Sequence, residues 1–169
     1  LEIKAKKGDE NFFVLPRPIL NRGGCNLSFA GLKTVVLREA QKIKKDKRLK
    51  LNLAASFQKT VIDILKKKTS VAIEQFRELT KNNNADLIVA GGVAANEKIK
   101  EALSELCRNK KINPIFPSKE FCGDNAAMIA WAGIQNFKFK KGNQLNVTAK
   151  SRWPLDPQAP FMKGPGLKI

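Results

Sequence analysis

The stretch LIVAGGVAAN at residues 87–96 decides the fold of this chain. Its first four residues form a short apolar run after Asp86, which is typical of an inner strand of a parallel sheet. Gly91 and Gly92 end this run and predict a sharp turn, because glycine is favoured where a chain bends tightly. Asn96 is a residue type that begins helices, and the apolar positions after it have helical spacing.

A strand, a glycine-rich turn and a helix N-terminus together form a nucleotide-sized niche at the carboxyl end of a sheet. Gly91, Gly92 and Asn96 are therefore candidate nucleotide-binding residues. The glycines have a second interpretation, since close packing of the strand against the helix would require them without any ligand. The residues of this turn alone leave both interpretations open.

A second turn, FCGDNAAMIA, follows at residues 121–130. Asp124 stands just before a run of small side chains with helix-compatible spacing. An aspartate in this place can cap the helix by accepting hydrogen bonds from backbone N–H groups, which contributes about 1 kcal/mol. Its carboxylate can also bind a metal ion held at a crevice. On chemistry alone, both roles stay open.

Around the two turns, the apolar pattern predicts helices that alternate with short strands. Helical spacing runs from about residue 30 to 43 and again over 53–79, as one long helix or as two broken near Thr69-Ser70. A short strand is expected near 114–116 and a helix after Asp124. Helix, strand, helix, strand, helix is part of a parallel-sheet α/β unit.

Composition indicates a cytoplasmic protein. The chain has 169 residues, of which 43% are hydrophobic, enough for one core or for a large part of a two-lobed one. No apolar run reaches the length of a membrane span, and the first residues lack a signal-peptide pattern. Three cysteines, Cys25, Cys107 and Cys122, lie far apart without a CxxC motif, so neither disulfides nor a zinc site is indicated.

The net charge of +17 invites a nucleic-acid interpretation, since clustered lysine and arginine neutralise phosphates. Many lysines, such as Lys66 to Lys68, are nevertheless typical of solvated faces without a ligand. The densest block, KIKKDKRLK at residues 42–50, is predicted to be a basic connector between two helices. It either contacts RNA or is a solvated loop, and the sequence leaves this open.

Five collinear segments carry a resemblance to a known family. They are FVLPRP at 13–18, SFAGLKT at 28–34, the two turns, and RWPLD at 152–156. In this order they resemble the carboxyl-terminal half of the TsaD/Gcp family. Members of this family are tRNA adenosine threonylcarbamoyltransferases and were long named O-sialoglycoprotein endopeptidases. The resemblance runs from about residue 12 to residue 156.

The resemblance implies the two-lobed fold of actin, sugar kinases and Hsp70. Residues 1–156 would form the carboxyl-terminal lobe, and residues 157–169 a loop-like tail for which we expect disorder. The amino-terminal lobe, with its glycine-rich phosphate loop, would lie outside this chain. The chain is a fragment by this interpretation.

The resemblance also implies roles for the candidate residues. Asn96, with Gly91 and Gly92 leaving room, would contact the adenosine end of threonylcarbamoyl-AMP. Asp124 would bind an iron or zinc ion together with an HxxxH pair outside this chain, which contains no histidine. The metal would polarise the carbamoyl carbonyl and orient it toward the N6 amine of an adenosine beside the tRNA anticodon. TsaB-like and TsaE-like proteins would be partners.

Two other functions remain as alternatives. A noncatalytic nucleotide- or partner-binding lobe would keep the first turn but do no chemistry. A metallopeptidase, as the older family name suggests, is disfavoured because no serine or cysteine here has a histidine to activate it. Arg17, between two prolines, is a further candidate for a contact with tRNA or a partner.

Overall fold

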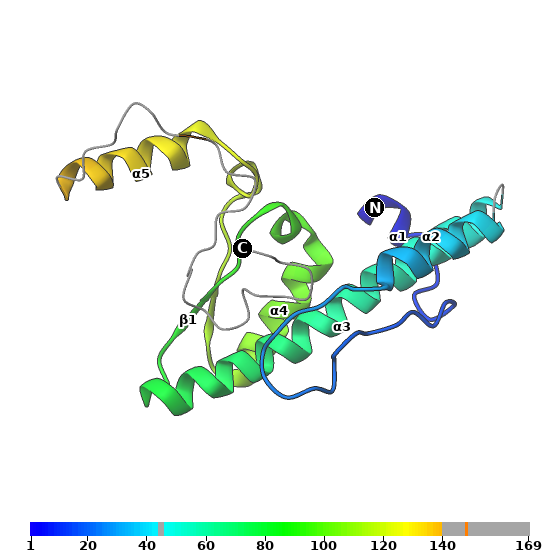
Figure 1. Ribbon diagram of the computed structural model, residues 1–169, viewed down its shortest axis with the longest axis horizontal. Helices are drawn as coiled ribbons and strands as arrows, with labels where there is room; N and C mark the ends of the chain where they lie inside the picture. Colours follow the sequence, from blue (N-terminus) through cyan, green and yellow to red (C-terminus); the bar gives the residue numbers. More distant parts are fainter. Residues whose placement is uncertain (44–45, 140–147, 149–169) are drawn as a thin grey trace. The chain divides into compact units, whose positions relative to one another are not determined.

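The computed structural model describes residues 1–43, 46–139 and 148. It divides into two compact units, Leu1–Asn125 and Ala126–Ile169, and each is described by itself. The elements of the first unit are shown in Figure 1 and are α1 (Glu2–Ala5), α2 (Leu32–Ile43), α3 (Lys47–Thr80), β1 (Asp86–Ile88), the 3-10 turn η1 (Gly92–Ala95), α4 (Glu97–Lys110), β2 (Asn113–Ile115) and the 3-10 turn η2 (Lys119–Phe121).

Helix α3 is the central element of the first unit, and α1, α2 and α4 all pack against it (Figure 1). It runs for 34 residues, so the pattern over 53–79 is one helix and not two. The helix begins where the Asp46 carboxylate accepts a hydrogen bond from the Leu49 N–H at 2.9 Å. It ends at Lys81, which adopts a left-handed conformation with φ of 56°.

Most of the basic block at 42–50 belongs to helices, whereas the sequence predicts a connector between two helices. Helix α2 continues to Ile43, and α3 starts at Lys47 because Asp46 caps it. Lys47–Lys50 are therefore helical, while residues 44–45 lie outside the described part of the chain. The possible RNA contact of this block stays a prediction.

Besides a small alanine cluster between α1 and α3, two larger apolar clusters form the core of the first unit. One joins the extended N-terminal segment, α2 and α3, and the other joins α3, α4 and the residue before β2. Their buried members are Leu15, Leu32 and Leu53 in the first cluster, and Ile73, Cys107 and Ile112 in the second. Burial of one leucine or isoleucine side chain contributes about 1.5–3 kcal/mol. Burial also raises the pKa of the Cys107 thiol, so this group is neutral and serves packing. All three cysteines are free, as expected.

Strands β1 and β2 form a parallel pair, with α4 as the crossover between them. This confirms the α/β unit predicted around the first turn. Within the described residues, β1 pairs with β2 alone and Ile88 is 70% exposed, so the inner position expected for this strand stays a prediction. Leu87, on the opposite face, packs against the cluster around Ile73. The two-lobed fold implied by the family resemblance stays a prediction.

The second unit contains helix α5 (Ala126–Lys138), which confirms the helix predicted after Asp124. Its large apolar side chains are exposed, and they are Met128, Ile129, Trp131, Ile134 and Phe137. A helix of this composition is typical of a protein interior. The RWPLD segment and the tail predicted at 157–169 lie outside the described residues. No described helix combines the length and apolar character needed to cross a membrane.

The prediction of a solvated lysine face at residues 66–68 is wrong for Lys68, which is buried. It is 2% exposed, and its ammonium donates hydrogen bonds to the backbone carbonyls of Arg22 at 2.7 Å and Gly24 at 3.1 Å. The sequence did not indicate this, since both acceptors lie more than 40 residues away in the chain. Lys68 therefore fastens the glycine-rich turn at 22–24 to α3.

We expect Lys68→Met to lower the free energy of unfolding by about 2 kcal/mol, because both hydrogen bonds to a charged donor are lost while the apolar stem is kept. Urea denaturation followed by circular dichroism measures this loss. Lys67→Met, at an exposed neighbour, is the matched control and should change stability by less than about 0.5 kcal/mol. Equal losses in the two variants would contradict the role of Lys68.

Candidate nucleotide-binding site

Asn96 lies at the N-terminus of α4, and both ends of its carboxamide are engaged. Its Oδ1 accepts a hydrogen bond from the Ile99 N–H at 3.1 Å, which confirms the predicted cap. Its Nδ2 donates to Oε1 of Gln58 on α3 at 3.0 Å. The same side chain thus starts α4 and ties that helix to α3.

The two glycines leave open space at the turn before α4. Gly91 has φ of 91°, a conformation that residues with a Cβ rarely adopt. Gly92 starts η1, and apart from the adjoining residues no atom of the described chain lies within 4 Å of the place where a Cβ would stand on either glycine. Close packing of strand against helix therefore does not explain Gly92. The space beside it is available to a ligand.

Gly92 and Asn96 line one cavity of about 480 Å³ between α3 and the turn that precedes α4. Its walls are mainly apolar, and its side-chain amides are those of Gln58 and Asn96. The apolar lining consists of Leu1, Phe29, Phe57, Val61, Leu65, Val93 and Ile99. This volume and this composition are typical of small-molecule sites. Gly91 is not part of the lining, so the structure brings together two of the three predicted nucleotide-binding residues.

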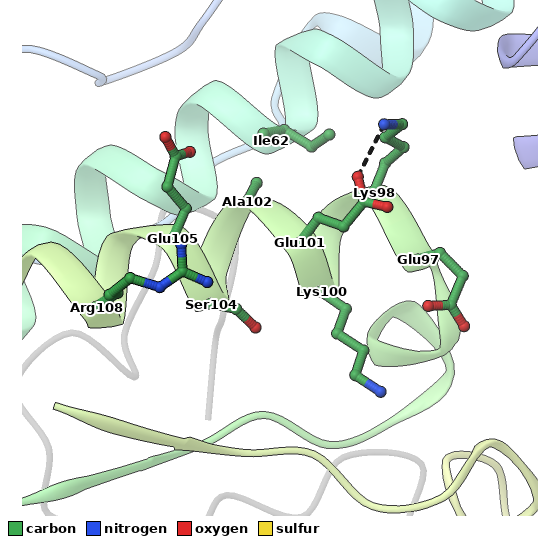
Figure 2. A pocket seen from close by; sticks show the side chains of 9 residues that line it. All are labelled: Ile62, Glu97, Lys98, Lys100, Glu101, Ala102, Ser104, Glu105 and Arg108. Atoms are coloured by element: carbon green, nitrogen blue, oxygen red, sulfur yellow. Dashed lines mark hydrogen bonds and ion pairs between the residues drawn. The ribbon is translucent and has the colours of Figure 1, made fainter.

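A larger hollow of about 640 Å³ lies along α4 and is a poorer candidate (Figure 2). Its charged side chains are three acidic and three basic ones, and some of them form ion pairs within the lining or with a neighbouring residue. Lys98 contacts Glu101 at 2.8 Å, as Figure 2 shows, and Glu105 contacts Lys66 at 3.0 Å. The hydrogen bond that Lys98 donates to the Glu101 carboxylate raises the pKa of Lys98. Since the carboxylates offset the cations, this hollow has no dominant charge with which to attract a phosphate.

Asp124 is exposed and lies after η2. The described residues contain no group of three or more histidine, cysteine, aspartate or glutamate side chains that could hold a metal ion. A carboxylate is a suitable ligand for iron or zinc, but such sites need several protein ligands. The described part of the chain therefore does not form a complete metal site by itself. The metal-binding and capping roles of Asp124 both stay predictions.

Arg17 has a role in the fold that the sequence did not indicate. Its Nη2 and Nε donate to Oδ2 of Asp63 on α3 at 2.7 and 3.0 Å, and its Nη1 donates to the Leu15 carbonyl at 3.3 Å. These bonds fasten the proline-flanked segment to α3. The guanidinium is therefore engaged within the chain, where the sequence suggested a contact with tRNA or a partner.

Comparison with known proteins identifies the family. The family model for TsaD, described as tRNA N6-adenosine threonylcarbamoyltransferase, matches residues 1–131. The chain belongs to the TsaD family. This match includes every residue that lines the 480 Å³ cavity, as well as Asp124, and it ends within α5. The resemblance seen in the sequence is thereby confirmed.

Individual TsaD relatives agree with the family match. Proteins named tRNA N6-adenosine threonylcarbamoyltransferase are 51% identical in Pelagibacter ubique, over 100% of this chain and 47% of the relative. The protein of this name from Roseobacter denitrificans is 40% identical over 99% of this chain and 47% of the relative. The one from Rhodospirillum rubrum is 40% identical over 98% of this chain and 46% of the relative. The chain spans about half the length of the curated relatives it matches.

Gln58 also lines this cavity, although the sequence pattern did not single it out. Gln58 is 9% exposed and lies 38 residues before its partner Asn96. It stands in the apolar pattern of the long helix, directly after Phe57. A polar amide in the buried stripe of a helix needs a hydrogen-bond partner, and this was the signal available in the sequence.

Proposed function

We propose that this chain is the carboxyl-terminal portion of a tRNA N6-adenosine threonylcarbamoyltransferase. In this proposal, the cavity beside Asn96 accepts the adenosine end of threonylcarbamoyl-AMP. The supporting observation is that Gly92 and Asn96, singled out from the sequence as nucleotide-binding residues, line the same mainly apolar cavity. Apolar walls suit the faces of a purine, and a few polar groups suit its edge.

The part of this chain in the reaction is to bind and orient the donor. Apolar side chains of α3, including Phe57 and Val61, exclude water from the base. The open space at Gly92, which lines the cavity, lets the ribose or phosphate approach the backbone. With the donor held in this way, the N6 amine of the tRNA adenosine attacks the carbamoyl carbon, the bond from that carbon to the phosphate oxygen breaks, and AMP leaves.

The proposal extends to a metal and to partners outside the chain. Asp124 would provide one carboxylate ligand to an iron or zinc ion shared with histidines of the amino-terminal lobe. Besides tRNA, the partners would be that lobe and the TsaB-like and TsaE-like proteins, and the setting would be the cytoplasm. No residue of this chain is assigned as a general base.

Titration calorimetry of the 169-residue chain with AMP tests the proposed site. We expect Asn96→Ala to weaken AMP binding about tenfold, because the variant loses a contact in the cavity and loosens the start of α4. Asp46→Ala is the matched control, since it removes the cap of α3 at Leu49 away from the cavity, and it should leave the affinity unchanged. Absence of AMP binding in the wild-type chain, or an unchanged affinity in Asn96→Ala, would count against the site.

A second candidate function is a noncatalytic nucleotide- or partner-binding lobe. It is favoured by the lack of histidine in this sequence and by the lack, among the described residues, of a cluster of three or more side chains that could hold a metal ion. Mixing the chain with a separately produced amino-terminal half of the protein distinguishes the two functions. A transferase half should gain threonylcarbamoyl transfer to tRNA on mixing, whereas a noncatalytic lobe should gain none.

A further inference from the structure

Two side-chain amides form a directed chain of hydrogen bonds at the cavity. The backbone N–H of Ile99 can only donate, so the Asn96 atom that it meets at 3.1 Å is the acceptor Oδ1. The other end of Asn96 is therefore the donor Nδ2, and the Gln58 atom 3.0 Å away from it is the acceptor Oε1. The backbone of α4 thus fixes the orientation of both amides.

This orientation leaves the donor end of Gln58 for a ligand. Its Oε1 is taken by Asn96, so its remaining polar group is Nε2, which carries two N–H donors. Within the described part of the chain, Nε2 donates no hydrogen bond, and Gln58 lines the cavity while being 9% exposed. A donor in a mainly apolar cavity favours ligands that offer an acceptor and disfavours those that do not.

We propose that Gln58 determines specificity in this cavity by donating a hydrogen bond from Nε2 to a ring nitrogen of the bound purine, with Asn96 fixing its orientation. The inference rests on the proposed function, because it takes the ligand to be an adenine nucleotide. The N1, N3 and N7 atoms of adenine are acceptors that suit this donor. A purine with an N–H at the contacted position would bring two donors together and bind less well.

Deaza analogues of AMP test this contact directly. In 1-deaza-, 3-deaza- and 7-deaza-AMP, one ring nitrogen is replaced by C–H, which cannot accept a hydrogen bond. We expect the wild-type chain to bind one of the three analogues about tenfold more weakly than AMP. In Gln58→Met, which keeps the length of the side chain but has no donor, AMP should bind about tenfold more weakly and the difference between AMP and that analogue should disappear.

Two further variants sharpen the test. Gln75→Met makes the same substitution on α3 at a side chain that contacts Cys25 and does not line the cavity, so it should keep the wild-type pattern. Gln58→Glu keeps an acceptor for Asn96 but replaces the donor with a second acceptor, so it should bind AMP more weakly still. Thermal unfolding checks that each variant is folded. If Gln58→Met does not fold, Gln58→Glu replaces it in the comparison of AMP with the deaza analogues.

The outcomes separate this inference from the proposed function. If the wild-type chain binds AMP and all three analogues equally well, the role of Gln58 is wrong and the nucleotide site stands. The same holds if Gln58→Met keeps the wild-type preference. If the wild-type chain binds no AMP, the proposed site itself is wrong and the inference falls with it.

Discussion

Gly8→Ala is expected to lower the free energy of unfolding by about 3 kcal/mol, the largest loss of stability that we predict for a single methyl group. A Cβ on Gly8 would stand 2.1 Å from the carbonyl oxygen of Leu51, 2.4 Å from its carbonyl carbon and 2.7 Å from the Asn52 nitrogen. All three are backbone atoms of α3. Since a helix backbone cannot rotate aside as a side chain can, the segment around Gly8 has to move away.

This movement would disturb the contact between α1 and α3. Next to Gly8, the Asp9 N–H donates to Oδ1 of Asn52 at 2.9 Å, and the small side chain of Ala5 packs against two alanines of α3. Urea denaturation measures the loss. Gly23→Ala is the matched control, because apart from the adjoining residues no described atom lies within 4 Å of its Cβ position, and it should change stability by less than about 0.5 kcal/mol. A similar loss in both variants would show that the close approach at Gly8 is not the cause.

The strand, turn and helix around residues 87–96 could be predicted because their determinants are local. The apolar run, the two glycines and the capping asparagine act on neighbouring backbone atoms, and β1, η1 and α4 follow in that order. The same is true of α5, whose helical spacing is a property of the segment itself. Local rules also placed Gly92 and Asn96 at the turn where the cavity lies.

Burial and long-range partners could not be predicted from local patterns. The apolar run at β1 predicts a buried strand, yet Ile88 is 70% exposed in the described part of the chain, while Leu87 on the other face packs against the cluster around Ile73. Lys68 looks like a surface lysine, yet it is buried under a turn from a distant part of the sequence. Gln58 was missed for the same reason, since its partner Asn96 becomes visible only when α4 packs against α3.

Asp124→Ala is expected to abolish metal binding when this chain is combined with the matching amino-terminal half. The sequence contains no histidine, and in the proposed function Asp124 is the ligand that this chain would contribute. We expect about one equivalent of iron or zinc in the wild-type pair and less than about a tenth of that in the variant. Metal analysis after dialysis measures both. Glu120→Ala, at another exposed carboxylate, should retain the metal.

Asp124→Asn separates the two roles that the sequence left open for Asp124. Asparagine caps helices about as well as aspartate, but its neutral amide is a much poorer ligand for iron or zinc. If Asp124 is a metal ligand, the reconstituted pair that carries Asp124→Asn should lose its metal. The melting temperature of the isolated Asp124→Asn chain should then stay unchanged. If Asp124 is a helix cap, both variants should retain the metal, and stability should fall by about 1 kcal/mol in Asp124→Ala only.

The isolated wild-type chain should bind no stoichiometric metal and should leave tRNA unmodified, because in this proposal it supplies one of several metal ligands. Stoichiometric metal in the isolated chain would contradict the shared site.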